Sequence, residues 1–308
     1  MDAAVAKLLW QQREDIGPAS RANCAMAYEA SASRVILFGG GHWKDYVDVF
    51  NDTWGWDGDS WVQLADTGPS PRQLPRLAFD VDRQVIVLFG GNTPSGWLFD
   101  TWEWDGSAWT QIEDVGPGAE TFYCDMAYDE ARRLTLLSCG SVESGGEGTW
   151  TWDGSAWTQV DDGGPRRRDL TGLAYDPERN RAVLFGGGPW FGARYGDTWE
   201  WDGAVWKQAE DIGPPARSGH SIAWDGKSVL LFGGHGVDNS GKGRFLGDTW
   251  AWDGARWRQR QDIGPHPRVN HALAWDSARD RTVLFGGWFG IYPNDRIFGD
   301  TWEAFEKI

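Results

Sequence analysis

The sequence predicts an all-β fold, a ring of six four-stranded sheets in which each sheet forms one blade. Three observations support this prediction. One unit is repeated six times along the 308-residue chain without a linker. Apolar and aromatic residues within each unit alternate with the period of a β-strand. The two ends of the chain also hold complementary parts of a single unit.

The repeated unit is defined by three motifs. An apolar run ends in Gly-Gly, Asp-Thr-Trp-x-Trp-Asp-Gly-x-x-Trp follows, and Gly-Pro closes the unit. Repeats of this length indicate a supersecondary unit copied around a ring or along a stack. The Gly-Pro pairs, spaced 48 to 51 residues apart, begin at Gly17, Gly68, Gly116, Gly164, Gly213 and Gly264.

Each unit is expected to contain four strands, which we call a to d. In the fifth unit they are predicted at 220–224, 229–232, 248–252 and around Trp257. Asp-Gly turns at Asp225 and Asp253 are short hairpin signals and separate a from b and c from d. Gly233-Gly234 is expected to end strand b and to open a long, variable loop to strand c.

The chain ends predict how the ring closes. Residues 7–13 have the pattern of a strand d with no a, b or c before it, and residues 301–305 have the pattern of a strand c with no d after it. Pairing these two strands would leave no exposed terminal blade. We therefore expect a single domain, residues 1–308, with blades at about 20–65, 71–113, 119–161, 167–210, 216–260 and 267–308 plus 7–13.

Charge and composition narrow the classes of partner. The net charge of −16 argues against nucleic acid and anionic membranes. Residues 1–12 contain no signal-peptide pattern and no 18-residue apolar run occurs, so a cytoplasmic protein is expected. No phosphate-binding loop or dinucleotide motif appears, so no nucleotide cofactor is expected. The repeated aspartates, such as Asp52 and Asp57, are expected to bond local backbone in turns.

The whole chain resembles the kelch family of β-propellers. The resemblance rests on double glycines such as Gly39-Gly40 and on paired tryptophans such as Trp56 and Trp61, while the third unit departs from the pattern at Cys139-Gly140. It implies a six-bladed kelch-type β-propeller. It does not imply one activity, because kelch rings serve as adaptors, oxidases, isomerases and specifier proteins.

The d–a and b–c connections are long and variable, so the face that they form is the predicted site face. Aromatic and basic residues outside the repeat pattern lie in these loops. They could form an aromatic-walled pocket for a flat or sugar-like ligand, or they could pack the loops onto the ring. The expected substrate-binding residues are Trp43, Trp97, Tyr123, Trp190, Arg244, Trp288 and Arg296.

Cysteine and histidine residues recur at one position of the unit, three residues after a repeated arginine. Thiolate and imidazole are suitable ligands for copper, zinc or iron, so one transition metal ion is expected. The alternatives are that these histidines cap strands or bond loops, that the cysteines pack as small apolar residues, or that Cys124 and Cys139 form a thiol pair. The expected ligands are Cys24, Cys124, His220 and His271.

Arg76 and Asp125 replace small residues at the next position of the unit. We expect them to form a pair near the central channel, either as an ion pair or as an acid–base residue beside its positive partner. They are the predicted catalytic residues. The repeated arginine itself, exemplified by Arg21, is expected to be structural.

Two functions follow from these expectations. The first is a small-molecule enzyme that uses a transition metal at the mouth of the channel, with a ligand that is anionic or aromatic. The alternative is a non-catalytic kelch binding module for a peptide, a carbohydrate or another small ligand on the same face. A protein partner is compatible with either function.

Overall fold

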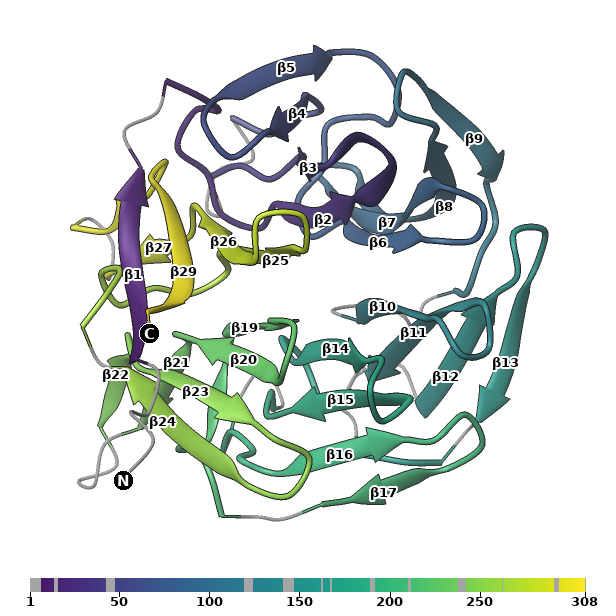
Figure 1. The fold of residues 1–308 in the computed structure, drawn as a ribbon. Coiled ribbons are helices and arrows are strands. Elements are labelled where there is room, and N and C mark those ends of the chain that lie inside the picture. Colours follow the sequence, from purple (N-terminus) through teal and green to yellow (C-terminus); the bar gives the residue numbers. More distant parts are fainter. Residues whose placement is uncertain are drawn as a thin grey trace.

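The computed structural model describes residues 7–13, 16–42, 48–118, 124–140, 147–161, 163–166, 168–188, 192–209, 212–237, 242–261, 263–290 and 294–307. Six four-stranded antiparallel sheets surround a common centre (Figure 1). Each sheet has one inner strand nearest the centre, and the inner strands are β2, β6, β10, β14, β19 and β25. Each inner strand contacts the inner strands of both neighbouring sheets, and β2 contacts β25.

We number the sheets along the chain. Sheet 1 contains β2 (Ala25–Glu29), β3 (Arg34–Phe38), β4 (Thr53–Trp56) and β5 (Trp61–Ala65), and η1 (Ala30–Ala32) connects β2 to β3. Sheet 2 contains β6 (Arg76–Asp80), β7 (Val85–Thr93), β8 (Gly96–Trp104) and β9 (Trp109–Glu113). Sheet 3 contains β10 (Asp125–Asp129), β11 (Leu134–Gly140), β12 (Glu147–Trp152) and β13 (Trp157–Asp161).

The remaining sheets repeat this order. Sheet 4 contains β14 (Gly172–Asp176), β15 (Arg181–Phe185), β16 (Thr198–Trp201) and β17 (Trp206–Gln208). Sheet 5 contains β19 (Ser221–Trp224), β20 (Val229–Phe232), β23 (Thr249–Trp252) and β24 (Trp257–Gln261). Sheet 6 contains β25 (Ala272–Asp276), β26 (Arg281–Phe285), β29 (Thr301–Lys307) and β1 (Lys7–Arg13).

The two ends of the chain contribute neighbouring strands to sheet 6. β1 pairs with β29 in an antiparallel register that places Trp10 opposite Ala304 and Gln12 opposite Trp302. β29 pairs in turn with β26, with Trp302 opposite Leu284. The N-terminal strand therefore occupies the outer position that β5, β9, β13, β17 and β24 occupy in the other sheets.

The core consists of the layers between adjacent sheets. Alternate residues of β3 face opposite sides: Val35 and Leu37 pack toward sheet 6, whereas Ile36 and Phe38 pack toward sheet 2. Both faces of a sheet are buried, which explains why its second strand is a continuous apolar run. The largest fully buried side chains include the second tryptophan of the Trp-x-Trp motif, at Trp56, Trp104, Trp152, Trp201 and Trp252.

The tryptophan of each outer strand joins neighbouring sheets. Its indole Nε1 donates a hydrogen bond to Oγ1 of the threonine that begins the Thr-Trp-x-Trp run, or its counterpart in sheet 6, in the preceding sheet. The six pairs, at 2.8–2.9 Å, are Trp61–Thr301, Trp109–Thr53, Trp157–Thr101, Trp206–Thr149, Trp257–Thr198 and Trp10–Thr249. The same tryptophan explains the Gly-Pro motif, because a Cβ on Gly264 would lie 2.6 Å from Trp10 Cδ1.

The b–c connections differ from the expected simple loops. In sheet 2 the strand does not end at Gly90-Gly91, because β7 continues through both glycines into a tight hairpin with β8. Sheet 5 carries a small additional sheet of β18 (Arg217–Ser218), β21 (His235–Val237) and β22 (Gly243–Phe245). Sheet 6 carries a short pair of β27 (Trp288–Phe289) and β28 (Arg296–Ile297).

No helix in the described ranges is long and apolar enough to cross a membrane.

Candidate ligand-binding site

The repeated arginine anchors the loops of the site face. Arg217 is fully buried, donates to both carboxylate oxygens of Asp248 at 2.7 and 2.8 Å, and also donates to the Gly233 carbonyl at 2.9 Å. Equivalent pairs are Arg21–Asp52, Arg72–Asp100, Arg168–Asp197 and Arg268–Asp300. The predicted structural role of these arginines is confirmed. The expected role of Asp52 and its equivalents is corrected, because they bind a guanidinium, whereas Asp57 bonds the turn amides of Asp59 and Ser60.

Some loop aromatics pack against this arginine layer. The Arg21 guanidinium lies 3.9 Å from the centre of the Phe50 ring, and the Arg168 guanidinium lies 4.6 Å from that of Tyr195. Arg268 stacks in the same way on Phe298 at 3.9 Å. These aromatic residues therefore pack the loops onto the ring, which was one of the two roles expected for the loop aromatics. Fewer loop aromatics remain that could contact a ligand.

A belt of backbone hydrogen bonds surrounds the mouth of the channel. It involves the residue two positions after the repeated arginine, which has a positive φ of 53–66° at Asn23, Leu74, Leu170, Gly219 and Asn270. The amide of Asn23 donates to the carbonyl of Asn270, that of Asn270 to Gly219, that of Gly219 to Leu170 and that of Leu74 to Asn23, at 2.7–3.0 Å. The left-handed conformation turns each amide toward the neighbouring sheet, which links the sheets at the axis.

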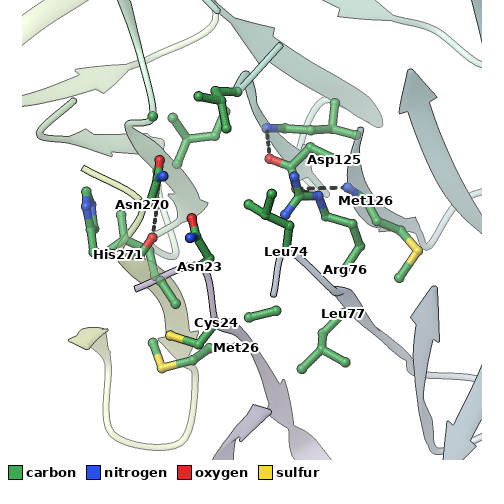
Figure 2. A pocket seen from close by; sticks show the side chains of 18 of the residues that line it. Asn23, Cys24, Met26, Leu74, Arg76, Leu77, Asp125, Met126, Asn270 and His271 are labelled. Atoms are coloured by element: carbon green, nitrogen blue, oxygen red, sulfur yellow. Dashed lines mark hydrogen bonds and ion pairs between the residues drawn. The ribbon is translucent and has the colours of Figure 1, made fainter. Parts of the chain in front are cut away.

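A cavity of ≈ 130 Å³ lies at this belt, and all six inner strands contribute to its lining. Figure 2 shows Arg76 and Asp125 on one side of the cavity, across from Asn23 and Asn270. Arg76 Nε lies 4.0 Å from Asp125 Oδ1. The structure therefore brings together the two residues that sequence reasoning paired.

Both members of this pair are engaged in bonds between sheets. Arg76 donates to the carbonyl of Cys124 in the next sheet. Asp125 Oδ2 accepts a hydrogen bond of 3.0 Å from the amide of Leu173 in the sheet after that, and Oδ1 accepts one of 2.9 Å from Met126. Ser221, at the same position in sheet 5, likewise donates to the His271 carbonyl at 2.5 Å. These bonds link neighbouring sheets, and the catalytic role of Arg76 and Asp125 stays a prediction.

Burial raises the pKa of Asp125, and the nearby Arg76 guanidinium opposes this rise only in part. The side chain is 29% exposed and lines the channel cavity. Desolvation disfavours a charged carboxylate in such a place.

The four predicted metal ligands share a packing position between sheets. The His220 ring lies edge-on to Phe185 at 5.5 Å, and the His271 ring lies edge-on to Phe232 at 5.4 Å. Cys24 belongs to the core cluster that contains Phe285, and Cys124 to the one that contains Phe89. The two histidines therefore contact the phenylalanine of the second strand in the preceding sheet, and the two cysteines share a core cluster with the equivalent phenylalanine.

This arrangement does not fit the predicted metal site. Cys124 is disulfide-bonded, so the expectation that it offers a thiolate is wrong. Cys24 is 7% exposed, and burial raises its thiol pKa to about 12. No group of three or more histidine, cysteine or acidic side chains in the part of the chain that the structure describes is arranged to hold a metal ion.

The disulfide bond of Cys124 also bears on the expected cytoplasmic location. Disulfides are rare in cytoplasmic proteins, so the bond weighs against that location, which stays a prediction.

His220 and His271 are 4% and 3% exposed. Burial, together with Arg217, lowers the pKa of His220 to about 3. Burial, with Arg268, also lowers the pKa of His271 well below its usual value. Among the described residues, neither imidazole has a hydrogen-bond partner within normal geometry. Both rings are therefore neutral, and they fill space in the core between adjacent sheets.

A second and larger hollow, which we call the aromatic pocket, lies on the site face beside the channel mouth. Its volume is ≈ 640 Å³, and its lining shares Leu170, Gly219 and Asn270 with the channel cavity. Aromatic side chains from β21, β22 and β27 form much of the wall: Phe245 lies 5.2 Å from His235, 5.3 Å from Trp288 and 4.9 Å from Phe289.

Two charged side chains also line the aromatic pocket. Arg194 comes from the b–c connection of sheet 4, and Asp295 from that of sheet 6. Arg194 is fixed by hydrogen bonds from Nε to Ser218 Oγ at 3.2 Å and from Nη1 to the Gly192 carbonyl at 3.1 Å. Burial, together with the charge of Arg194, lowers the pKa of His235.

The predicted substrate-binding residues divide into three groups. Trp288 lines the aromatic pocket. Trp97 pairs with Asn92 in the β7–β8 hairpin, Arg244 pairs with Gly236 beside Phe245, and Arg296 lies over the Phe298 ring at 4.9 Å and lines a separate hollow with Arg13. None of these three is part of the pocket lining. Trp43, Tyr123 and Trp190 lie outside the described residues.

Sequence reasoning missed Asp295, Ser218 and Asn270 as parts of the site. Asp295 could not be found from the repeat, because it lies in a connection of sheet 6 that has no equivalent residues in the other units. Asn270 belongs to the repeat, and its equivalence with Asn23 and Gly219 was a usable signal, since these residue types favour a positive φ.

Comparisons with known proteins support the fold alone. No protein-family model matches the sequence, and no curated protein matches it. A solved structure described as "Structure of YjhT" superimposes with a TM-score of 0.70 at 13% sequence identity, over 92% of this chain and 95% of that chain. The repeated four-stranded sheets and this similarity together show that the chain has a β-propeller fold.

Proposed function

We propose that this chain is a six-bladed kelch-type propeller that binds a small organic molecule in the aromatic pocket. The observation that carries the binding proposal is the pocket itself, in which His235, Phe245, Trp288 and Phe289 surround ≈ 640 Å³ beside the channel mouth. Ligand sites commonly have volumes of about 300–1,000 Å³, apolar walls and a few polar groups. The aromatic pocket has all three properties.

Three observations support the six-bladed ring and its closure. Six four-stranded sheets occur in the described ranges, and the β1–β29 pair joins the two ends of the chain in one of them. The Trp10–Thr249 bond also repeats, at sheet 6, the contact made by every other outer strand. A closed ring holds the loops of sheets 4, 5 and 6 in fixed positions, and the pocket depends on all three.

Binding is better supported than metal-dependent catalysis. The predicted ligands pack between sheets, and Cys124 has no thiol. The carboxylate oxygens of Asp125 accept hydrogen bonds from two backbone amides, and Arg76 bonds the Cys124 carbonyl. By contrast, the side chains of His235, Phe245, Trp288 and Phe289 line a pocket large enough for a small molecule.

The proposal is tested with tryptophol, a neutral indole alcohol, as the probe. Ligand-observed NMR should detect saturation transfer to its indole protons. Phe245→Ala should weaken binding about tenfold, because one aromatic contact is worth about 1 kcal/mol beyond its buried area. Phe305→Ala is the matched control, since Phe305 lies on β29 beside Arg281 and outside the pocket. Phe289→Ala provides a second variant if Phe245→Ala folds poorly. Absence of binding, or equal loss in the control, would overturn the proposal.

A further inference from the structure

We infer that the ligand of the aromatic pocket is a zwitterion, a molecule that carries a carboxylate and an ammonium group on a flat apolar body. This inference rests on the proposed function and specifies its ligand class. It is based on two observations. Arg194 and Asp295 place opposite charges on the wall of one largely aromatic pocket, and each has polar atoms without a hydrogen-bond partner among the described residues.

Arg194 presents a fixed positive charge to the pocket. Ser218 and Gly192 accept hydrogen bonds from Nε and Nη1, so the guanidinium is held in place. Its Nη2 makes no hydrogen bond to any described residue. An arginine with a free nitrogen beside an apolar wall is suited to a carboxylate, because charge-assisted hydrogen bonds are strong where water is partly excluded.

Asp295 presents the opposite charge. It is partly buried, lines the same pocket, and makes no hydrogen bond or ion pair within the described ranges. Among the residues that the structure describes, Asp295 and Arg194 form no ion pair with each other, although both line one pocket. Asp248 and Asp300, on the same face, are each paired with an arginine. Asp295 is therefore free to bind an ammonium group.

The geometry of the three loops separates the two charges. Arg194 lies on the connection of sheet 4 and Asp295 on that of sheet 6, while Phe245 and His235 come from sheet 5 between them. A ligand with an apolar ring on the aromatic wall would therefore lie between two opposite charges. His235 does not add a competing cation, because burial and Arg194 favour its neutral form.

Four probes with the same indole body separate the contributions of charge. They are L-tryptophan, a zwitterion; indole-3-propionate, an anion; tryptamine, a cation; and tryptophol, which is neutral. Dissociation constants are measured by NMR titration at low salt. We expect tryptophan to bind at least about tenfold more tightly than tryptophol, with the two singly charged probes between them.

Two substitutions assign the charges. Arg194→Met should reduce tryptophan and indole-3-propionate binding about tenfold and leave tryptamine unchanged. Asp295→Asn should reduce tryptophan and tryptamine binding and leave indole-3-propionate unchanged. Arg244→Met is the matched control on the neighbouring strand, because Arg244 is absent from the pocket lining.

The outcomes distinguish this inference from the proposed function. If tryptophol does not bind, the proposed function fails. If tryptophol binds and Phe245→Ala weakens it, but tryptophan has no advantage over tryptophol, only the zwitterion inference fails. If one singly charged probe equals tryptophan, the inference is also overturned, because one of the two charges then makes no contact.

Discussion

Trp10 Nε1 donates a hydrogen bond of 2.9 Å to Thr249 Oγ1, so a residue near the start of the chain is fixed to the third strand of sheet 5. The same contact occurs at 2.8 Å in pairs such as Trp109–Thr53, where both partners lie in the middle of the chain. In addition, Trp10 packs against Phe232 with ring centres 5.2 Å apart. The N-terminal strand therefore makes the same indole–threonine contact to the preceding sheet as the outer strands of the other sheets, although Trp10 lies opposite Ala304 and not opposite a second tryptophan.

Thr249→Val should destabilise the protein as much as Thr53→Val. Each substitution preserves shape and leaves an indole N–H without its acceptor, at a cost of about 1–3 kcal/mol. Equilibrium unfolding in urea measures both values. A much smaller effect for Thr249→Val would mean that the terminal strand frays, and it would contradict closure of the ring by β1.

Asp248→Asn should lower the free energy of unfolding by about 3 kcal/mol at neutral pH, because it leaves Arg217 buried without its anion. Burial alone would raise the pKa of Asp248, but hydrogen bonds from Arg217 and Trp250 more than offset this, so its pKa is lowered. The carboxylate therefore stabilises the fold above its unfolded pKa of about 3.9, and this stabilisation is lost as the pH falls further.

The pH profile of unfolding checks this assignment. The wild type should lose stability steeply between about pH 4 and pH 3, and Asp248→Asn should show a shallower slope there. Asp59→Asn is the control, because the Asp59 side chain is 95% exposed. Equal slopes in the wild type and Asp248→Asn would contradict the lowered pKa.

His220→Thr should make stability less dependent on pH between 7 and 5. The folded imidazole has a pKa of about 3, whereas the unfolded one titrates near 6.5. The unfolded state therefore takes up the proton first, and stability falls as the pH drops below about 6.5, by about 2 kcal/mol at pH 5 for this histidine. Threonine occupies the equivalent position at Thr171, which makes it a suitable replacement.

Urea unfolding at the two pH values measures the difference. His266→Thr provides the comparison, because His266 lies at an exposed position. If the wild type and His220→Thr lose equal stability on acidification, His220 is protonated in the native state, and its assignment as a neutral ring that fills space in the core is wrong.

Thiol labelling should distinguish Cys24 from Cys124. In the native protein Cys24 should resist alkylation, because it is buried and its thiol pKa is raised to about 12. Unfolding without a reductant should expose Cys24, whereas Cys124 should react only after reduction. Peptide mass spectrometry measures both. Labelling of Cys124 without reduction would restore it as a candidate metal ligand.

The repeat by itself determined much of the fold. The period-two pattern, the Asp-Gly turns and the Gly-Pro pairs place the strands because each depends on backbone geometry within a few residues. The incomplete units at the chain ends predicted the pairing of residues 7–13 with β29, which the structure contains. The pairing of Arg76 with Asp125 was predictable as well, since both occupy the same position in adjacent units.

The tertiary structure alone decided which of these residues can meet a ligand. Cys24, His220 and His271 share a position in the repeat, but each side chain packs in the core together with a phenylalanine of the preceding sheet. Arg194 and Asp295 lie in connections without a repeat pattern. Strand positions follow from local periodicity, whereas the convergence of side chains from three loops depends on how those loops fold against one another.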